Sequence, residues 1–446
     1  MSNLSYAAAP AGGVTGPEGR SKGHDEEVTP SEIAVGVIIG RSSEYFDFFV
    51  FGIAAVLVFP SVFFPHFSKL NGTLLSFGVF ALAFIARPIG TAISMAIQRR
   101  WGRATKLTTA LFLLGSCTVG MAFLPSYETL GRTAIALLVL FRFGQGLALG
   151  GSWDGLPSLL AMSAPKGRRG WYSMMGQLGA PLGFVLAASL FAYLYGSLSE
   201  EEFLTWGWRY PFFVAFAVNV VALFARLQLV MGQNYSKLME ERELVPVGVA
   251  KLIDEEGGNV ALGAFAALAS FALFHLVTVF PLSWIVMFSD QPVVEVLSVQ
   301  IAGACCAAVA IAASGWIADR FGRRNTLGVM AVLIGLFSLA TPMLLSSGTS
   351  GNNVFIILGF ILLGLSYGQS SGTVTSNFSP TYRYTGAALS TDMAWLIGAA
   401  FAPLVALGLS AKFGLIAVSI YLLSGVVCTL VALAINRAVE GRETTV

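Results

Sequence analysis

The sequence predicts an all-α integral membrane protein with twelve transmembrane helices. Only 11% of its residues are charged and 56% are hydrophobic, whereas a soluble domain carries roughly a quarter charged residues. The apolar residues also form long runs, and run after run exceeds the ~20 residues that a helix needs to cross the hydrocarbon core. These two observations exclude an ordinary soluble domain.

The apolar segments fall into two sets of six, which predict an N-terminal bundle over residues 33–230 and a C-terminal bundle over 260–436. Residues 231–259 are rich in charge and predict a cytoplasmic linker. Residues 1–32 are expected to form a disordered cytoplasmic tail and 437–446 a short one. The segments cover residues 33–60, 73–97, 106–124, 133–162, 171–195, 209–230, 260–288, 295–318, 326–346, 353–378, 385–409 and 411–436.

The distribution of Lys and Arg predicts that both termini are cytoplasmic. Roughly 19 of the 26 Lys and Arg residues fall in segments that are inside under this topology, and only about 4 fall outside. The outer segments contain the acidic run 200–202 instead. Because positive charge is retained on the cytoplasmic side, we expect the N-in, C-in orientation.

An internal repeat supports two six-helix halves. Residues 97–103 read IQRRWGR and match residues 317–323, IADRFGR, at the same point of the second set. Duplicated halves are typical of transporters that rock around a site between the repeats.

Residues 315–324, GWIADRFGRR, resemble the loop signature G-x-x-x-D-R-x-G-R-[RK] of the major facilitator superfamily. Residues 142–146, RFGQG, resemble the R-x-x-Q-G pattern of its proton-coupled members. The segments 44–49, 86–90, 207–212 and 383–386 are similar to motifs of the metabolite:proton symporter group. The resemblance implies the twelve-helix major facilitator fold and proton-driven uptake of polar metabolites, commonly carboxylates and in some members betaines or proline.

Three positions depart from the pattern of this group. Arg99 stands where the first-half signature has an acid, and Ser152 and Ser376 stand where the group usually has Glu. The departures keep open a uniporter, an exporter, or a symporter of zwitterionic or neutral polar solutes.

Two carboxylates in the first segment are candidates for proton coupling. Glu44 and Asp47 are three residues apart and share a helix face with Arg41. In a low-dielectric site, mutual repulsion and desolvation favour protonation of at least one of them. The alternative is an ionised pair held permanently by Arg41 and Arg142.

Arg142 is the first candidate for substrate binding, because it lies near the middle of its segment. Its guanidinium could clamp a substrate carboxylate or release a proton from a carboxylate of the first helix. The alternative is a static salt bridge to Asp47 or Glu44. Charges inside a membrane are costly, so each is a candidate functional residue by default.

Three further ionisable residues lie inside predicted membrane helices. Arg87 is expected to bind substrate, to gate or only to pack. Asp392 is expected to pair with Arg383, Arg87 or a loop arginine as a gate, or to act as a second proton site. His275 titrates in the physiological range, but a buried histidine among phenylalanines is often structural.

The remaining site candidates are polar residues of the membrane segments and the basic inner loops. Substrate-binding candidates are Gln145, Tyr45, Trp153, Gln177, Tyr367, Gln369 and Asn377. Gating candidates are Asp319, Arg320, Arg323, Arg99, Arg103 and Asp154.

No nucleotide-binding, nucleophile-elbow or zinc-protease motif is present, so an enzyme, a cofactor and a bound metal are not expected. The expected partners are a small substrate, protons and the lipid bilayer, with no nucleic acid and a monomer sufficient for function. The sequence therefore predicts a proton-coupled symporter of a small carboxylate in the cytoplasmic membrane. A sensor built on a transporter scaffold is the alternative of another class.

Overall fold

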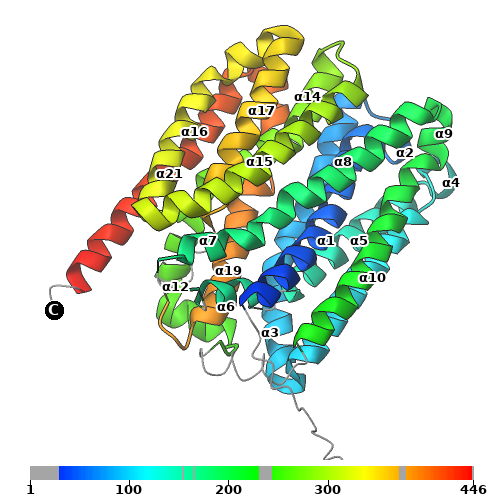
Figure 1. Cartoon of the computed structure of the whole chain (residues 1–446). Coiled ribbons are helices and arrows are strands. Elements are labelled where there is room, and N and C mark those ends of the chain that lie inside the picture. The colour runs from blue at the N-terminus through cyan, green and yellow to red at the C-terminus, as the bar shows by residue number, and fades with distance from the viewer. Residues whose placement is uncertain are drawn as a thin grey trace, which may run out of the picture.

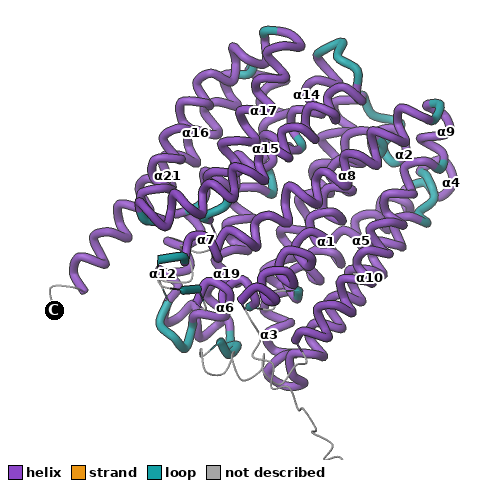
Figure 2. Tube along the Cα trace, viewed as in Figure 1, coloured by secondary structure: helices purple, strands orange, loops and turns teal. Residues whose placement is uncertain are grey.

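The computed structural model describes residues 30–152, 155–162, 164–165, 167–230, 244–370 and 378–443 of the chain. Within these residues all regular structure is helical. Long helices run side by side through the molecule, and short helices and loops gather at its two ends (Figures 1 and 2). The predicted all-α membrane fold is confirmed.

The helices of the N-terminal half follow in chain order. They are α1 (Pro30–Leu57), α2 (Phe59–Val62), α3 (Lys69–Ala122), α4 (Tyr127–Leu130), α5 (Arg132–Gly151), α6 (Leu156–Met162), α7 (Arg169–Met175), η1 (Gly176–Leu178), α8 (Gly179–Ser197), α9 (Glu200–Thr205), η2 (Gly207–Arg209) and α10 (Tyr210–Val230).

The C-terminal half adds a second set of helices. They are α12 (Val249–Ala266), α13 (Leu268–Thr278), α14 (Phe280–Phe288), α15 (Val293–Phe321), α16 (Arg323–Ser346), α17 (Gly348–Tyr367), α19 (Arg383–Ala394), η3 (Trp395–Ala399), α20 (Ala402–Phe413) and α21 (Ile416–Glu443). Helix α12 begins inside the segment predicted as linker and leaves helical geometry at Glu256.

Ten helical segments among the described residues are long and apolar enough to cross a membrane. One of them, α3, consists of two helices that meet at Gly102, whose φ of 87° interrupts the helix. Gly146 of α5 faces Ala83, and Gly144 faces Cys117, so both parts of α3 lie along α5 and the chain reverses at Gly102. Helix α1 is also long enough to cross, but Arg41, Glu44 and Asp47 make it too charged to be recognised by composition.

We call the end of the molecule with the Gly102 reversal the Gly102 end, and the opposite end, which carries α9, the α9 end (Figure 1). Helices α8 and α15 lie side by side and join the two halves of the chain. A large buried cluster, rich in phenylalanine, extends across both halves.

Several predicted segments are interrupted in the structure, among them 133–162 and 260–288. The segment 133–162 was expected as one helix, but α5 ends at Gly151 and α6 begins at Leu156 after Gly155, whose φ is 76°. The segment 260–288 is likewise divided near Ala267 and Val279. Runs of apolar residues do not reveal such breaks, because the residues at a break remain in an apolar environment.

Close packing of α3 on α5 positions the polar residues described below. A Cβ on Gly146 would collide with the backbone of Ala83, and one on Gly150 would collide with the carbonyl of Arg87. Small residues allow membrane helices to approach this closely, because lipid supplies no hydrophobic drive between helices.

Candidate functional site

Helix α1 has two faces with different partners. Glu44 and Asp47 point into the N-terminal half, where α5 and α10 provide their partners. Tyr45 and Phe48 contact residues of the C-terminal half, among them His275. Helix α1 therefore connects the buried charges of one half to the interface between the halves.

Asp47 belongs to a buried polar chain that ends at Arg142. The Thr118 hydroxyl donates to Oδ1 of Asp47 at 2.6 Å, and Nε2 of Gln145 donates to Oδ2 at 3.0 Å. Oε1 of Gln145 accepts from Nη1 of Arg142 at 3.0 Å. Among the described residues Arg142 forms no ion pair, so the predicted alternative of a static salt bridge to Asp47 or Glu44 is not what the structure contains.

Arg142 is fully buried and surrounded by aromatic rings. Its guanidinium carbon lies 4.0 Å from the ring centre of Phe51, 4.9 Å from Phe80 and 5.5 Å from Phe48. Nε donates to the carbonyl of Phe80 at 3.3 Å, whereas Nη2 has no hydrogen-bond partner in the described part of the chain. Cation–π contacts stabilise the charge but leave one donor available for a ligand.

Glu44 lies in a separate ionic cluster. Its carboxylate pairs with Arg226 at 2.6 Å and with Arg41 at 3.0 Å, and Arg226 also donates to the carbonyl of Ser152 at 2.9 Å. Sequence analysis did not select Arg226, because it lies near the predicted inner end of its segment, where Arg usually marks topology. Its 5% exposure shows that it is a buried partner instead.

Arg87 and Asp392 form an ion pair between the two halves. Nε of Arg87 donates to Oδ1 of Asp392 at 2.6 Å, and the Thr91 hydroxyl hydrogen-bonds to the other carboxylate oxygen. The guanidinium also lies 5.9 Å from the ring of Trp395. Of the partners that the sequence suggested for Asp392, the structure selects Arg87.

Aromatic side chains pack against one another between the two halves. The hydroxyls of Tyr45 and Tyr367 hydrogen-bond to each other across the interface. Trp395, the first residue of the π-helical turn η3, contacts Tyr45, Phe48 and His275. Trp395 is not among the residues predicted from the sequence, because its π-helical turn, a feature that often marks a functional site, is visible only in the structure.

His275 is fully buried at this interface. Its Nδ1 lies 3.3 Å from the Thr278 hydroxyl, and its Nε2 has no hydrogen-bond partner among the described residues. The imidazole stacks on Phe48 with ring centres 5.2 Å apart. A buried polar atom without a partner is uncommon and indicates a position where a ligand could bind.

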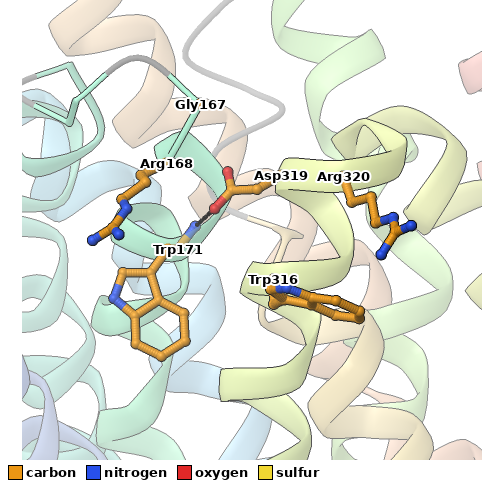
Figure 3. A pocket seen from close by; sticks show the side chains of 6 residues that line it. All are labelled: Gly167, Arg168, Trp171, Trp316, Asp319 and Arg320. Carbon is orange, nitrogen blue, oxygen red and sulfur yellow. Dashed lines mark hydrogen bonds between the residues drawn. The ribbon is translucent and has the colours of Figure 1, made fainter.

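The Gly102 end contains a further set of contacts between the halves. The backbone amides of Gly170 and Trp171 donate to Asp319 at 2.6 and 3.1 Å, and Arg323 donates to Ser173 at 2.8 Å. Figure 3 shows the adjoining pocket of about 530 Å³, with Trp171 and Trp316 on opposite sides. Its lining residues are Gly167, Arg168, Trp171, Trp316, Asp319 and Arg320.

The other predicted site residues are dispersed. Gln369 donates to the carbonyl of Gly170 at 3.4 Å and to Ser314 at 3.2 Å, and Gln177 is buried near the start of α8. Arg99 is exposed and Arg103 is half-buried at the Gly102 end. Trp153, Asp154 and Asn377 lie outside the described residues.

Buried charges inside a helical bundle, with one ion pair joining its two halves, are typical of secondary transporters. The sequence model of the Major Facilitator Superfamily matches residues 48–403, and the chain belongs to this family. The protein is therefore a metabolite transporter and not an enzyme.

Similar proteins agree with this assignment. The inner membrane metabolite transport protein YhjE of Escherichia coli K12 is 36% identical over 93% of this chain and 96% of its own. The shikimate transporter of the same strain is 30% identical over 88% and 91%. The solved structure of the proton:xylose symporter XylE superposes with a TM-score of 0.68 at 17% identity, covering 91% of this chain and 94% of its own, which supports the fold alone.

Proposed function

We propose that the protein carries a small organic acid into the cell together with a proton, by alternating access. The observation that carries this proposal is the buried chain Asp47–Gln145–Arg142, in which an acid and a cation share one amide. The relative named as a shikimate transporter supports the choice of a carboxylate.

The shared amide suggests how anion and proton are coupled. In the structure the charges of Asp47 and Arg142 compensate each other through Gln145. When a substrate carboxylate binds Arg142, Asp47 loses this compensation in a low-dielectric site, where an isolated anion is costly. Protonation of Asp47 removes the cost, so one anion and one proton bind together. Glu44 is a weaker candidate than Asp47, because two arginines already neutralise it.

The contacts between the halves provide the gates. The Gly102 end is closed by the ion pair Arg87–Asp392 and by the contacts around Asp319, Arg320 and Arg323. These contacts break when the halves rock apart. Arg99, Arg103 and Asp154 belong to the same proposed gate, and Asp392 remains a second proton site. Substrate contacts beyond Arg142 are proposed for the polar residues selected from the sequence, of which Trp153 and Asn377 lie outside the described residues. They are Arg87, Tyr45, Gln145, Trp153, Gln177, His275, Tyr367, Gln369 and Asn377.

The proposed location is the cytoplasmic membrane, with both termini and the Gly102 end in the cytoplasm. A relative named as an inner membrane protein and the clusters of Lys and Arg support this. A monomer contains both halves and is sufficient for the mechanism.

Transport by purified protein in proteoliposomes with an internal pH dye tests the proposal. We expect acidification of the lumen on adding one subset of carboxylates, and no response to betaine, proline or sugars. Arg142→Ala should raise the half-saturating carboxylate concentration about 10- to 100-fold, since it removes a charge-assisted contact. Normal transport by Arg142→Ala would rule out the clamp.

Other results of this experiment lead to the alternatives. Entry of labelled solute without a pH change would mean uniport and would remove Asp47 as a proton carrier. Acidification with betaine or proline would mean a zwitterion symporter. Ligand binding without flux would favour a sensor.

A further inference from the structure

We propose that the transported acid also carries a hydroxyl group, which donates to Nε2 of His275 while the carboxylate binds Arg142. The inference rests on the proposed function and names the substrate class as small hydroxy-carboxylates. It is carried by two buried polar atoms without partners, Nη2 of Arg142 and Nε2 of His275, which lie on opposite halves of the chain around the same two rings.

The lengths of the two Thr278 contacts favour one tautomer of His275, because the hydroxyl hydrogen goes preferentially to the shorter contact. The Thr278 hydroxyl has one hydrogen, which it donates to the carbonyl of Phe274 at 2.7 Å. Toward Nδ1 of His275, 3.3 Å away, Thr278 can therefore only accept. Nδ1 then carries the hydrogen of the neutral imidazole, and Nε2 is left as an acceptor.

Arg142 presents the complementary group. Its Nε and Nη1 are occupied by Phe80 and Gln145, and Nη2 is an unused donor. A carboxylate oxygen is the partner that a buried guanidinium prefers. One donor from α5 and one acceptor from α13 thus await a ligand that supplies an anionic acceptor and a neutral donor.

Phe48 and Phe80 connect the two groups. The Phe48 ring centre lies 5.2 Å from that of His275 and 5.5 Å from the guanidinium carbon of Arg142. The corresponding distances for Phe80 are 5.1 and 4.9 Å. Because both rings lie against His275 and Arg142, at least one of them must move when a ligand enters. A ligand held by both groups would join the two halves at the interface of the repeats, where transporters of this build bind substrate.

The chemistry of the pair favours a hydroxyl over other groups. A plain carboxylate would leave Nε2 unpartnered, and a quaternary ammonium has no hydrogen to donate. A primary ammonium could donate, but it would bring a second positive charge close to Arg142. A hydroxyl satisfies Nε2 without added charge.

Matched pairs of acids test the proposal. Dissociation constants of purified full-length protein would be measured by thermal shift for lactate against propionate, malate against succinate, and shikimate against cyclohexanecarboxylate. We expect at least one hydroxy acid to bind about tenfold or more tightly than its deoxy partner, since a site built for a hydroxyl discriminates against its absence. Alanine should bind less tightly than lactate.

Variants assign the preference to His275. His275→Leu should bring the ratio within a pair close to one, and His275→Gln should retain part of it, because the side-chain oxygen still accepts. His66→Leu is the matched control, since His66 is exposed at the α9 end and should leave the ratio unchanged. If His275→Leu does not fold, His275→Phe, which matches the surrounding rings, takes its place.

Thr278→Val probes the protonation state itself. Without the Thr278 acceptor, the hydrogen can move to Nε2, so the preference for lactate over pyruvate, whose ketone only accepts, should fall. A merely structural His275 would not produce this change.

Several results would overturn the inference. Equal binding within every pair by the wild type, or a hydroxyl preference that persists in His275→Leu, contradicts it and leaves carboxylate symport standing. Absence of binding by every acid, or equal binding of an acid and its methyl ester, contradicts the proposed function instead.

Discussion

Glu44 and Asp47 are one helical turn apart on α1, yet their carboxylates have different partners. Glu44 contacts two arginines, and Asp47 contacts a hydroxyl and an amide. Full charge compensation favours a permanent anion at Glu44, whereas the neutral donors around Asp47 allow a proton to be exchanged. In the proposed mechanism Glu44 therefore has a structural role and Asp47 a transport role.

Glu44→Gln should destabilise the protein by about 3 kcal/mol or more, because it removes a buried carboxylate that pairs with both Arg226 and Arg41. Thermal unfolding in detergent, followed by intrinsic fluorescence, measures the change. Replacing both members of the pair, in Glu44→Gln with Arg226→Gln, should recover part of the loss. A single variant as stable as the wild type would contradict the structural role.

Asp47→Asn should separate substrate exchange from proton movement. The Asn oxygen can still accept from Thr118 or Gln145, so the site keeps its shape but has no group to protonate. We expect substrate counterflow to continue, while proton-driven accumulation falls about tenfold or more. Parallel counterflow and pH-dye assays in the same proteoliposomes measure the two. Normal proton uptake by this variant would exclude Asp47 and direct attention to Asp392.

At the scale of elements, the first part of α3 and helix α19 meet through one ion pair. Arg87 and Asp392 are held in place by Thr91 and by the close packing of α3 on α5 at Gly150. Breaking a buried pair is costly unless both charges find new partners. In the proposed mechanism the pair therefore resists opening of the Gly102 end.

Asp392→Asn should loosen this contact. The buried Ala388, one turn away on α19, can be replaced by Cys in a background without the native cysteines. We expect maleimide labelling of Ala388→Cys to become about tenfold faster, which corresponds to roughly 1.4 kcal/mol of lost closure.

Two controls accompany this labelling experiment. Exchange of the charges, Arg87→Asp with Asp392→Arg, should restore slow labelling. Asp290→Asn, at an exposed acid in the loop just before α15, should have no effect. Unchanged labelling in Asp392→Asn would show that the pair does not hold the halves together.

At the scale of the whole molecule, the orientation predicted from Lys and Arg can be tested directly. In intact cells an impermeant maleimide should label Glu201→Cys in α9 and should not reach Arg100→Cys beside the Gly102 reversal. Both side chains are exposed in the structure. After permeabilisation both positions should react. Labelling of Arg100→Cys alone in intact cells would mean that the molecule is inserted the other way round.

The fold and many candidate residues followed from local patterns in the chain. Long apolar runs predict membrane helices because each helix must satisfy its own backbone within the hydrocarbon core. Charged residues inside those runs, such as Asp47, Arg142 and Asp392, are recognisable for the same reason: a charge there is costly and rare. Neither inference requires knowing what a residue touches.

The partners of these residues were decided by tertiary structure alone. Arg226 pairs with Glu44 across 182 residues of sequence, and Arg87 pairs with Asp392 across 305. Which charges meet depends on the rotation of each helix and on the breaks at Gly151 and Val279, neither of which alters the apolar pattern. The sequence by itself therefore determined a helical membrane transporter with buried charges, because burial is a property of each segment. Only the packing of distant helices decided which buried charges compensate one another and which remain available to a ligand.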